Sequence, residues 1–498
     1  MSTTLSPPVA STADAERVVR DEQLAAQKIP VTRVKVVSIG GGLGSFALVD
    51  RLRIGGVAES DIAVVSAHRQ PAGAFLDRCI ASGLDLEDRL RSTSSARIDN
   101  PWGFPGYAAE EAWSRRSVKP LAGVLGDPLT DTYTPTLGVM HRGVTRESRR
   151  IGWSRMTVNA HADYLFKREG GGYFVVCRKG TRTVALHCDH VHLALGAHGP
   201  AYSPEAEAFR AEHPDSTRLR HVYEPHEDVL DELARTGGSV IVRGAGMAAA
   251  HLLDRIAEVR SRSGAEIHVW HVLRDWPVDD GSRANQRIGL GFAHQAFDFP
   301  LSAYGGELRD QLLATTDEEA RLQLIERWSA TSSPYRATSA EALSRGRHEG
   351  WYDAVVGEVA SFMPRGSKVV ASVRLQNGKE MALAADHVLD ATGMDDRADH
   401  HGLVADLLTF SPVGVNRLGG LRVDERFEVL GGSNGDGRIF ASGSTARGGP
   451  YGPVDSFGGL QHAALTIADE LASAGIGHRL NPWRSLTGWL RWIGGKSL

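Results

Sequence analysis

The chain has little cysteine. Its 498 residues include three, Cys79, Cys177 and Cys188, and no two of them form a C-x-x-C pair. Enzymes that exchange disulfides need a vicinal pair of reactive thiols, and iron–sulfur proteins need several thiolate ligands. The cysteine content therefore argues against both classes. It also suits a reducing compartment, so we expect a cytoplasmic protein.

The chain also lacks an excess of charge of either sign. Its 56 Lys and Arg side chains are balanced by 60 Asp and Glu side chains, which gives a formal net charge of −4. Without a basic field, nucleic acid is not expected as a partner. The 20 histidines are scattered and form neither an H-E-x-x-H motif nor a cluster with cysteine. We therefore expect no metal site.

Long apolar runs are absent as well. No stretch approaches the roughly 20 apolar residues that a membrane-spanning helix needs, so no membrane span is expected. The first residues are polar and lack a basic start followed by an apolar core. We therefore expect residues 1–30 to form a disordered tail and not a secretory signal. At this length, two or three domains are expected, with a composition ordinary for a globular enzyme.

Glycine, in contrast, is abundant, and two glycine-rich turns dominate the sequence. They lie in VKVVSIGGGLGS (34–45) and GSVIVRGAGMAAAHLLDRI (238–256). Each follows an apolar strand and opens an apolar helix, which lets the backbone and the helix N-terminus approach a pyrophosphate without an intervening Cβ. One such turn also serves ordinary tight turns, but a pair indicates two dinucleotides, FAD at the first and a nicotinamide at the second. The expected contacts are Gly40, Gly42, Gly244 and Gly246.

Four further positions complete these two motifs. Ser45 and Ala249 occupy the third small position of the first and second turns, where close packing of helix on strand is needed. The strand after the first turn normally ends in an acid that binds the adenosine ribose, and here that place holds Ser66. A hydroxyl can make one of the two expected bonds. Arg69 is the nearest other candidate.

Two strands that close on a glycine motif flank the second turn. One ends in Leu195-Gly196 and the other in Ala391-Thr392-Gly393, a pattern by which flavoproteins bring the chain back across the pyrophosphate. This repeat predicts a nicotinamide domain inserted into a flavin domain. We expect an α/β protein with an FAD-binding Rossmann-like domain at 31–219 and 381–475, an inserted NAD(P)H-binding Rossmann-like domain at 220–380 with a helical elaboration at 278–350, and a Trp-rich tail at 476–498.

The inserted segment carries one residue that bears on nucleotide choice. Arg274 lies about 25 residues after Gly244, where the second strand of such a domain should end. An arginine there accommodates a 2′-phosphate and favours NADPH, although the neighbouring Asp275 keeps NADH open. Farther on, apolar spacing predicts a helix over 317–328 and another in the second half of 340–362.

The last motif, GRIFASGSTARGGPYGPVDSFGGLQHAALTIADEL at 437–471, is a strand, a loop containing Gly443 and an apolar helix. We expect the helix to begin at Val454 or Asp455. Its N-terminus would stabilise the electron-rich pyrimidine edge of a reduced flavin, with Asp455 in contact with the cofactor. Asp455 could equally be only the N-cap of the helix.

With its segments in this order, the chain resembles the two-dinucleotide-binding-domain flavoproteins over roughly residues 33–475. Within them it is most similar to single-component FAD- and NADPH-dependent monooxygenases. The F-x-G-x-x-x-H signature of Baeyer–Villiger enzymes is absent before the second turn. The segment GFAHQAFDFP (291–300) is similar to the F-x-N-E-x-F-x-P segment of N-hydroxylating enzymes at Phe292, Phe297 and Pro300. His294 stands in place of the asparagine and Gln295 in place of the acid.

The resemblance implies an enzyme that reduces FAD with NADPH and transfers one oxygen atom from a flavin hydroperoxide to a small nucleophile, the amine of an amino acid or a related metabolite. Its partners would be that substrate and molecular oxygen. An amine must be neutral to attack, so His294 is a candidate base, although a structural histidine is the simpler interpretation. The alternatives are an NADPH-dependent oxidoreductase that passes electrons to an acceptor without oxygenation, and a regulatory flavoprotein without turnover.

The tail completes the set of expectations. Trp489 and Trp492 lie at helical spacing after Trp483. A short helix there would pack on its own flavin domain or on a second subunit, which makes a homo-oligomer one option. Membrane contact is a weaker alternative, because three cations attract anionic lipid only weakly.

Overall fold

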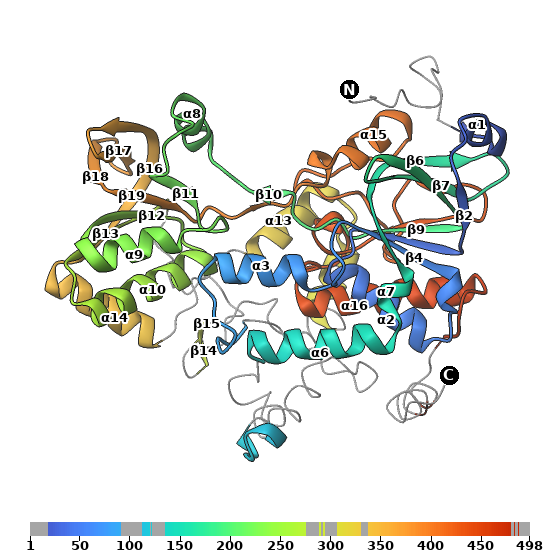
Figure 1. The fold of residues 1–498 in the computed structure, drawn as a ribbon, viewed down its shortest axis with the longest axis horizontal. Helices are drawn as coiled ribbons and strands as arrows, with labels where there is room; N and C mark the ends of the chain where they lie inside the picture. The colour runs from blue at the N-terminus through green and yellow to red at the C-terminus, as the bar shows by residue number, and fades with distance from the viewer. Residues whose placement is uncertain are drawn as a thin grey trace.

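The computed structural model describes residues 18–90, 112–119, 121, 135–274, 288–289, 292–293, 306–329, 337–479, 483 and 487. These residues form two lobes that lie side by side, each built on a mainly parallel sheet with helices packed on it (Figure 1). The expected α/β class with two Rossmann-like units is confirmed.

The first lobe holds a five-stranded parallel sheet in the order β21-β9-β3-β4-β5. Its strands are β3 (Val36–Ile39), β4 (Ile62–Ser66), β5 (Thr157–Asn159), β9 (His190–Leu193) and β21 (Ile439–Ala441). All residues of every strand except β5 are buried, as expected for a parallel sheet that is covered on both faces. The helices of this lobe are α2 (Leu43–Ile54), α3 (Gly73–Ala81), α6 (Leu137–Arg150), α7 (Trp153–Met156), α15 (Gly402–Phe410) and α16 (Phe457–Ser473), with short turns η1 (Glu59–Asp61), η3 (Ala398–His400) and η4 (Gly443–Ala446).

A second sheet of the first lobe corrects the expectation for the N-terminus. Its order is β1-β6-β7-β8-β2, with strands β1 (Val18–Val19), β2 (Val31–Arg33), β6 (His161–Arg168), β7 (Tyr173–Lys179) and β8 (Arg182–Cys188). Both β1 and β2 lie within the expected tail or directly after it, and α1 (Asp21–Ala26) joins them. Leu24 of α1 is fully buried against Phe166 and Phe174. The order of residues 18–30 comes from this packing, which local composition does not reveal.

The second lobe holds a seven-stranded sheet in the order β11-β19-β12-β13-β16-β17-β18. The first five strands run parallel and the last three form an antiparallel meander. Their bounds are β11 (Leu219–His221), β12 (Gly238–Arg243), β13 (Ile267–Leu273), β16 (Tyr352–Arg365), β17 (Lys368–Leu375), β18 (Glu380–Ala385) and β19 (His387–Asp390). Helices of this lobe are α8 (Pro204–Glu212), α9 (Glu227–Thr236), α10 (Met247–Ser263) and α14 (Ala337–Glu349).

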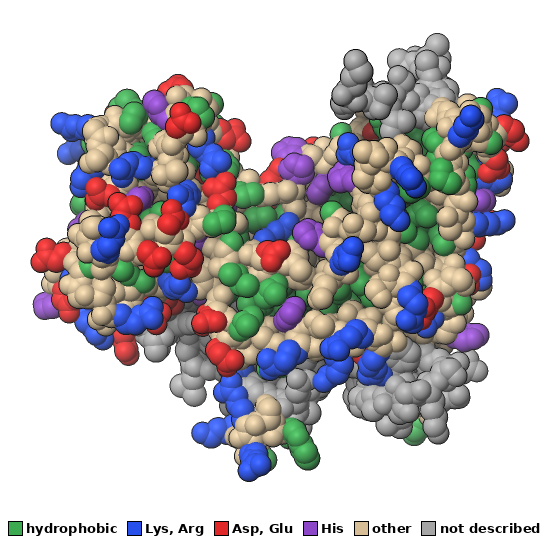
Figure 2. Space-filling model, in the orientation of Figure 1, with side chains coloured by type: hydrophobic (Ala, Val, Ile, Leu, Met, Phe, Trp, Pro, Cys, Tyr) green, Lys and Arg blue, Asp and Glu red, His purple; other side chains and the backbone are tan. Residues whose placement is uncertain are grey.

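This lobe is wider in sequence than the expected 220–380. Helix α8 packs on β16, and β19 lies between β11 and β12, so the unit extends on both sides. Two chain crossings connect it to the first lobe, and they pair as an antiparallel ribbon of β10 (Gly199–Pro200) and β20 (Met394–Asp395). Histidine side chains gather between the lobes on the face shown in Figure 2. Near the ribbon, the His198 and His401 rings meet edge to face.

The expected helical elaboration is divided between the lobes. Helices α12 (Glu307–Ala314) and α13 (Glu318–Ser329) pack through Leu308, Leu312 and Ile325 on Leu418 of the first lobe. Helix α14 instead packs on α10 and β16 of the second lobe. The helix expected over 317–328 is confirmed as α13. The helix expected in the second half of 340–362 is wrong, because that stretch forms β16.

The remaining described elements are small. Strands β14 (Ile288–Gly289) and β15 (Phe292–Ala293) form an isolated hairpin. Of the Trp-rich tail, only Trp483 and Thr487 are described beyond residue 479, and Trp483 is exposed. No described helix combines the length and the hydropathy that crossing a bilayer requires.

Candidate dinucleotide-binding sites

The first glycine turn joins the carboxyl end of β3 to the start of α2. Gly40 has a φ of +125°, and a Cβ there would stand 2.1 Å from the carbonyl oxygen of Ala194. Gly41 has a φ of +65°, and its Cβ would stand 2.2 Å from the side chain of Ser66. Gly42 differs, because its φ is −85° and no described heavy atom lies within 4 Å of where its Cβ would be.

The second turn, between β12 and α10, repeats this geometry at its first and third residues, while its middle residue, Ala245, does not share the positive φ of Gly41. Gly244 also has a φ of +125°, and its Cβ would stand 2.4 Å from the carbonyl oxygen of Ala391. Gly246 has a φ of −85°, with no described heavy atom within 4 Å of its Cβ position. The fold therefore needs glycine at Gly40 and Gly41 in the first turn and at Gly244 in the second, whereas Gly42 and Gly246 face open space.

We call the open space beside Gly42 the first cradle and the space beside Gly246 the second cradle. Each lies at a helix N-terminus, where the first amide groups have no partner within the helix and the macrodipole favours negative charge. A pyrophosphate fits there, since only glycine leaves the backbone free to approach it. The residues present thus fit one dinucleotide at each cradle.

The other glycines expected at the flavin site lie at the same edge of the first sheet. The Leu195 N–H donates to Oγ1 of Thr445 over 3.1 Å, which joins the end of β9 to η4. Gly196 and Gly443 lie on these same two segments, and both have positive φ, +69° and +66°. No described atom lies within 4 Å of a Cβ at Gly196.

Ser45 of the first turn is buried and belongs to a polar chain. Its Oγ accepts hydrogen bonds from the Gly41 N–H (3.1 Å) and from Oγ of Ser38 (2.8 Å). The Ser38 hydroxyl also contacts Nδ1 of His192 (2.9 Å), whose Nε2 contacts Oγ of Ser442 (2.8 Å). Burial lowers the pKa of His192 to about 3, so the ring is neutral. The sequence interpretation missed His192, although a histidine inside a buried strand was a visible signal.

The hydroxyl of Ser66 is occupied within its own turn. It accepts from the His68 N–H (3.0 Å) and donates to the His68 carbonyl (2.8 Å). Its side chain is buried against Gly41. A ribose contact from Ser66 stays a prediction. The exposed Arg69 holds α7 through its carbonyl, which accepts from Nε1 of Trp153 (3.2 Å).

Different residues lie around the second cradle. Gly393 follows β19 and so lies beside the second turn, with a φ of +116° and no described atom within 4 Å of its Cβ position. The Gly244 carbonyl is 2.7 Å from Nε2 of His271, a buried ring whose pKa is lowered by burial. Ala249 is buried in α10. Arg274 is exposed directly after β13, at the carboxyl edge that β13 shares with β12.

The helix after Gly443 begins later than expected. Ser456 is the N-cap of α16, and its Oγ accepts from the Gly459 N–H (3.0 Å). Asp455 is exposed, lies before the cap and does not cap the helix. Serine fits the cap position as well as aspartate does, so spacing alone could not choose between adjacent residues. A flavin contact from Asp455 stays a prediction.

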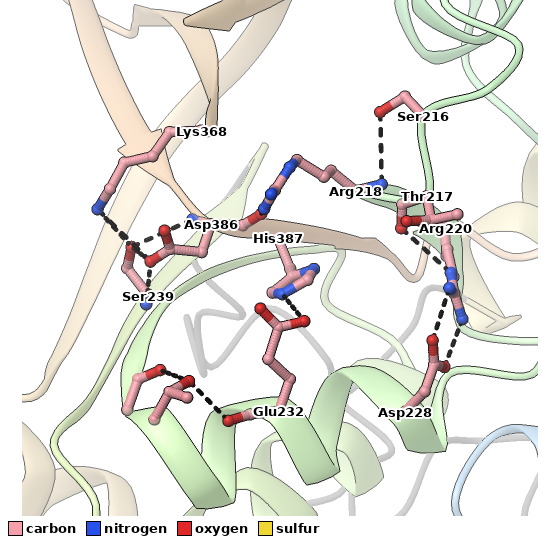
Figure 3. A network of polar contacts seen from close by, with 12 residues as sticks. Ser216, Thr217, Arg218, Arg220, Asp228, Glu232, Ser239, Lys368, Asp386 and His387 are labelled. Carbon is pink, nitrogen blue, oxygen red and sulfur yellow. Dashed lines mark hydrogen bonds and ion pairs between the residues drawn. The ribbon is translucent and has the colours of Figure 1, made fainter. Parts of the chain in front are cut away.

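A separate polar network occupies the opposite edge of the second sheet (Figure 3). Oδ2 of Asp386 accepts from the N–H and the hydroxyl of Ser239, both at 2.8 Å, and lies 3.5 Å from Nζ of Lys368. Arg220 and Asp228 form a bidentate pair beside it. Because Ser239 and Asp386 lie at the amino ends of β12 and β19, their contacts join these two strands at the edge away from the second cradle.

Two further expectations from the sequence concern His294 and the three cysteines. His294 lies outside the described residues, so its assignment as a candidate base stays a prediction. All three cysteines are described and buried. Burial raises the pKa of Cys79 and of Cys177 to about 12, and that of Cys188 well above its usual value.

Known proteins match this chain through structure alone. No protein-family model and no curated protein sequence matches it. The ornithine N-hydroxylase of Kutzneria sp. 744, solved with reduced FAD, NADP⁺ and L-ornithine, superposes with a TM-score of 0.65 at 14% identity, covering 89% of this chain and 100% of that one.

Two further structures have similar values. The cadaverine monooxygenase of Erwinia amylovora, solved with FAD, gives a TM-score of 0.65 at 11% identity and covers 91% of this chain and 98% of its own. The L-lysine 6-monooxygenase of Pseudomonas syringae gives 0.61 at 17% identity, with 89% and 99% covered. The chain therefore has the fold of the two-dinucleotide-binding-domain flavoproteins.

Proposed function

We propose that this protein is an FAD-dependent, NADPH-reduced monooxygenase that oxygenates the amine of a small molecule, an amino acid or a related diamine. The observation that carries the proposal is the pair of matching cradles in a chain that superposes on amine monooxygenases over almost their full length. Molecular oxygen is the second substrate in this proposal.

Each cradle has a defined task. Gly42 and the N-terminus of α2 bind the FAD pyrophosphate, while Gly196 and Gly443 let the chain approach the cofactor closely. Gly246 and the N-terminus of α10 bind the NADPH pyrophosphate, and Arg274 meets the 2′-phosphate. Bound FAD supplies the hydride and oxygen chemistry, so the protein binds, orients and excludes water.

Substrate selection is assigned to the segment around α12 and α13. These helices follow β13 of the second lobe in sequence but pack on the first lobe beside Leu418. Arg417 of the same loop donates to Glu326 and Glu319 of α13. An amine substrate reacts as the free base, and His294, which precedes these helices, is the proposed group that takes its proton.

The competing function is an NADPH-dependent oxidoreductase that delivers electrons to an acceptor. A disulfide acceptor is disfavoured, because the three cysteines are buried with raised pKa values and none can serve as an exchanging thiolate at neutral pH. Small or protein acceptors remain the alternative that the experiment must separate.

The test measures NADPH oxidation under air with L-ornithine, L-lysine, cadaverine and related amines, together with hydroxylated product and hydrogen peroxide. A monooxygenase yields hydroxylamine in proportion to the NADPH consumed with its proper amine. NADPH oxidation that yields only peroxide or reduced acceptor across the whole panel would establish the oxidoreductase instead. Gly246→Val is the control, since it should abolish NADPH-dependent turnover while FAD stays bound.

We further propose a cytoplasmic location and self-association through the C-terminal tail. Buried, unpaired cysteines suit a reducing compartment. Removing residues 481–498 should lower thermal stability or the molar mass in solution. An unchanged mass and an unchanged melting temperature would reject a role for the tail in assembly or packing.

A further inference from the structure

A buried chain of side chains crosses the carboxyl edge of the first sheet, from α2 to the start of η4. Ser45, Ser38, His192 and Ser442 lie in that order, with successive contacts of 2.8, 2.9 and 2.8 Å. All four are buried. Ser38 donates to Ser45, so Ser38 accepts from Nδ1–H of His192 and Nε2 accepts from the Ser442 hydroxyl. Every member then has a partner, and the directions are mutually consistent.

The second lobe provides an internal comparison, because its glycine turn forms without such a chain, although its middle residue, Ala245, does not share the positive φ of Gly41. Val242 stands two residues before Gly244 as Ser38 stands before Gly40, and Leu389 stands four residues before Gly393 as His192 stands before Gly196. The cross-strand registers agree as well, since Val242 pairs with Leu389 and Ser38 with His192. Ala249 corresponds to Ser45. All three second-lobe residues are buried and apolar.

This difference shows that the fold does not need the polar chain. Apolar side chains at the three equivalent positions give a turn with the same φ values at its first and third residues, Gly244 and Gly246. Replacing a buried polar group by an apolar one of similar shape is often neutral or stabilising, so a polar chain retained in one lobe only has another role. The contacts at the two ends of the polar chain indicate that role. Ser45 accepts from the Gly41 N–H, and Ser442 directly precedes Gly443.

We propose that His192 is a positioning residue that fixes the segments around the first cradle before FAD binds. The inference rests on the proposed FAD site. His192 lies in β9, which continues to Gly196, and it joins the glycine turn on one side to the η4 segment on the other. With hydroxyl directions fixed by a neutral ring, the Gly41 N–H stays bonded to Ser45 and the three segments keep one arrangement. Preorganisation of this kind increases affinity by lowering the ordering cost of binding.

The decisive variant gives the first lobe the residues of the second: Ser38→Val, Ser45→Ala and His192→Leu together. FAD affinity is measured by titrating apoprotein, beside the melting temperature of the apoprotein. We expect an apoprotein that melts within a few degrees of the parent but binds FAD on the order of tenfold more weakly. Parent-like affinity in the folded triple variant would overturn the inference. If the parent itself binds no FAD, the proposed function fails instead.

Three single variants keep the test decisive if the triple variant does not fold. Ser45→Ala removes one oxygen atom and should weaken FAD binding in the same direction, and unchanged affinity would count against the proposal. His192→Gln keeps a donor and an acceptor, whereas His192→Leu keeps neither. We expect FAD to bind more tightly to His192→Gln than to His192→Leu. Equal FAD affinity of these two variants would show that His192 acts only through packing.

Discussion

At the scale of single residues, the glycines of each turn divide into two kinds. Gly40 and Gly244 adopt a φ of +125° and face a backbone carbonyl, so the fold requires them. Gly42 and Gly246 have a φ that any residue can adopt and face open space, so the fold does not require glycine at these two positions. This distinction allows a substitution that separates binding from folding.

The first prediction uses Gly42. In Gly42→Val, a branched side chain would enter the first cradle, where no described heavy atom lies within 4 Å of the Cβ position, so the protein should fold with a parent-like melting temperature as apoprotein and lose FAD. Absorbance of the purified protein and its flavin-to-protein ratio are the measurements. Gly40→Val is the contrasting variant and should fail to fold. A folded Gly42→Val protein that still holds one FAD per chain would show that FAD does not bind at this turn.

The second prediction concerns Arg274. A charge-assisted contact with the 2′-phosphate is worth about 1.5–3 kcal/mol. Arg274→Ala should therefore raise the apparent Michaelis constant for NADPH about tenfold or more. The NADH constant should not change, because NADH has no 2′-phosphate. Both constants come from initial rates of nucleotide oxidation. Equal losses for the two nucleotides, or no loss, would make Arg274 a surface residue.

At the scale of elements, strands β12 and β19 are held together at their amino ends by Asp386. Burial raises the pKa of this carboxyl, but hydrogen bonds from Ser239 and the charge of Lys368 outweigh it, so the pKa lies below its usual value (Figure 3). A lowered carboxyl pKa stabilises the fold above the unfolded pKa, and that stabilisation is lost as the pH falls through the folded pKa.

The third prediction follows from the lowered pKa of Asp386. Asp386→Asn should lower the free energy of unfolding by about 1 kcal/mol at pH 7, because one charge-assisted pair of bonds is weakened. The difference from the parent should shrink below about pH 4, where the parent carboxyl also becomes protonated. Urea unfolding at several pH values measures both. A difference independent of pH would mean that the charge of Asp386 has no part in the effect.

Strand β16 shows where the local sequence pattern led to a wrong prediction. Residues 352–362 were expected to be helical, yet they pair with β13 and β17 as β16. The run contains Val355, Val356 and Val359, and burial alternates over part of it, as β-branched residues in a half-buried strand do. A short apolar run is ambiguous by period alone, and only pairing with neighbouring strands decides it.

At the scale of the whole molecule, the lobes are joined by the β10–β20 ribbon and by the α12–α13 segment. Arg417 of the first lobe bonds Glu326 at 2.9 Å through two nitrogens and Glu319 at 3.2 Å, and Arg422 bonds Glu318 at 2.9 Å. Helix α13 is therefore fixed to the first lobe, although β13 before it and α14 after it belong to the second lobe.

The fourth prediction tests this attachment. Arg417→Glu places like charges together and should reduce hydrogen-exchange protection of α13 amides. Adding Glu326→Arg restores a pair of opposite charges, since the arginine introduced on α13 then faces the carboxylate introduced on the loop, so protection should return. Amides of β13 serve as the internal control and should not change. Loss of protection that the second substitution does not repair would assign α13 docking to its apolar face.

The sequence by itself determined the class and the two turns. Glycine after a buried strand and before an apolar helix is a local pattern, so Gly40, Gly42, Gly244 and Gly246 were found at once. The strand after each turn and helix α13 followed from period and spacing alone. These features depend on residues close together in the chain.

Tertiary structure decided what depends on distant neighbours. It assigned Gly393 to the second cradle, because β19 pairs with β12 and not with the first sheet. It ordered residues 18–30 by burying Leu24, and it joined His192 to Ser38 and Ser442 across three strands. Strand order and buried hydrogen bonds arise from long-range packing, which leaves no periodic signal in the sequence.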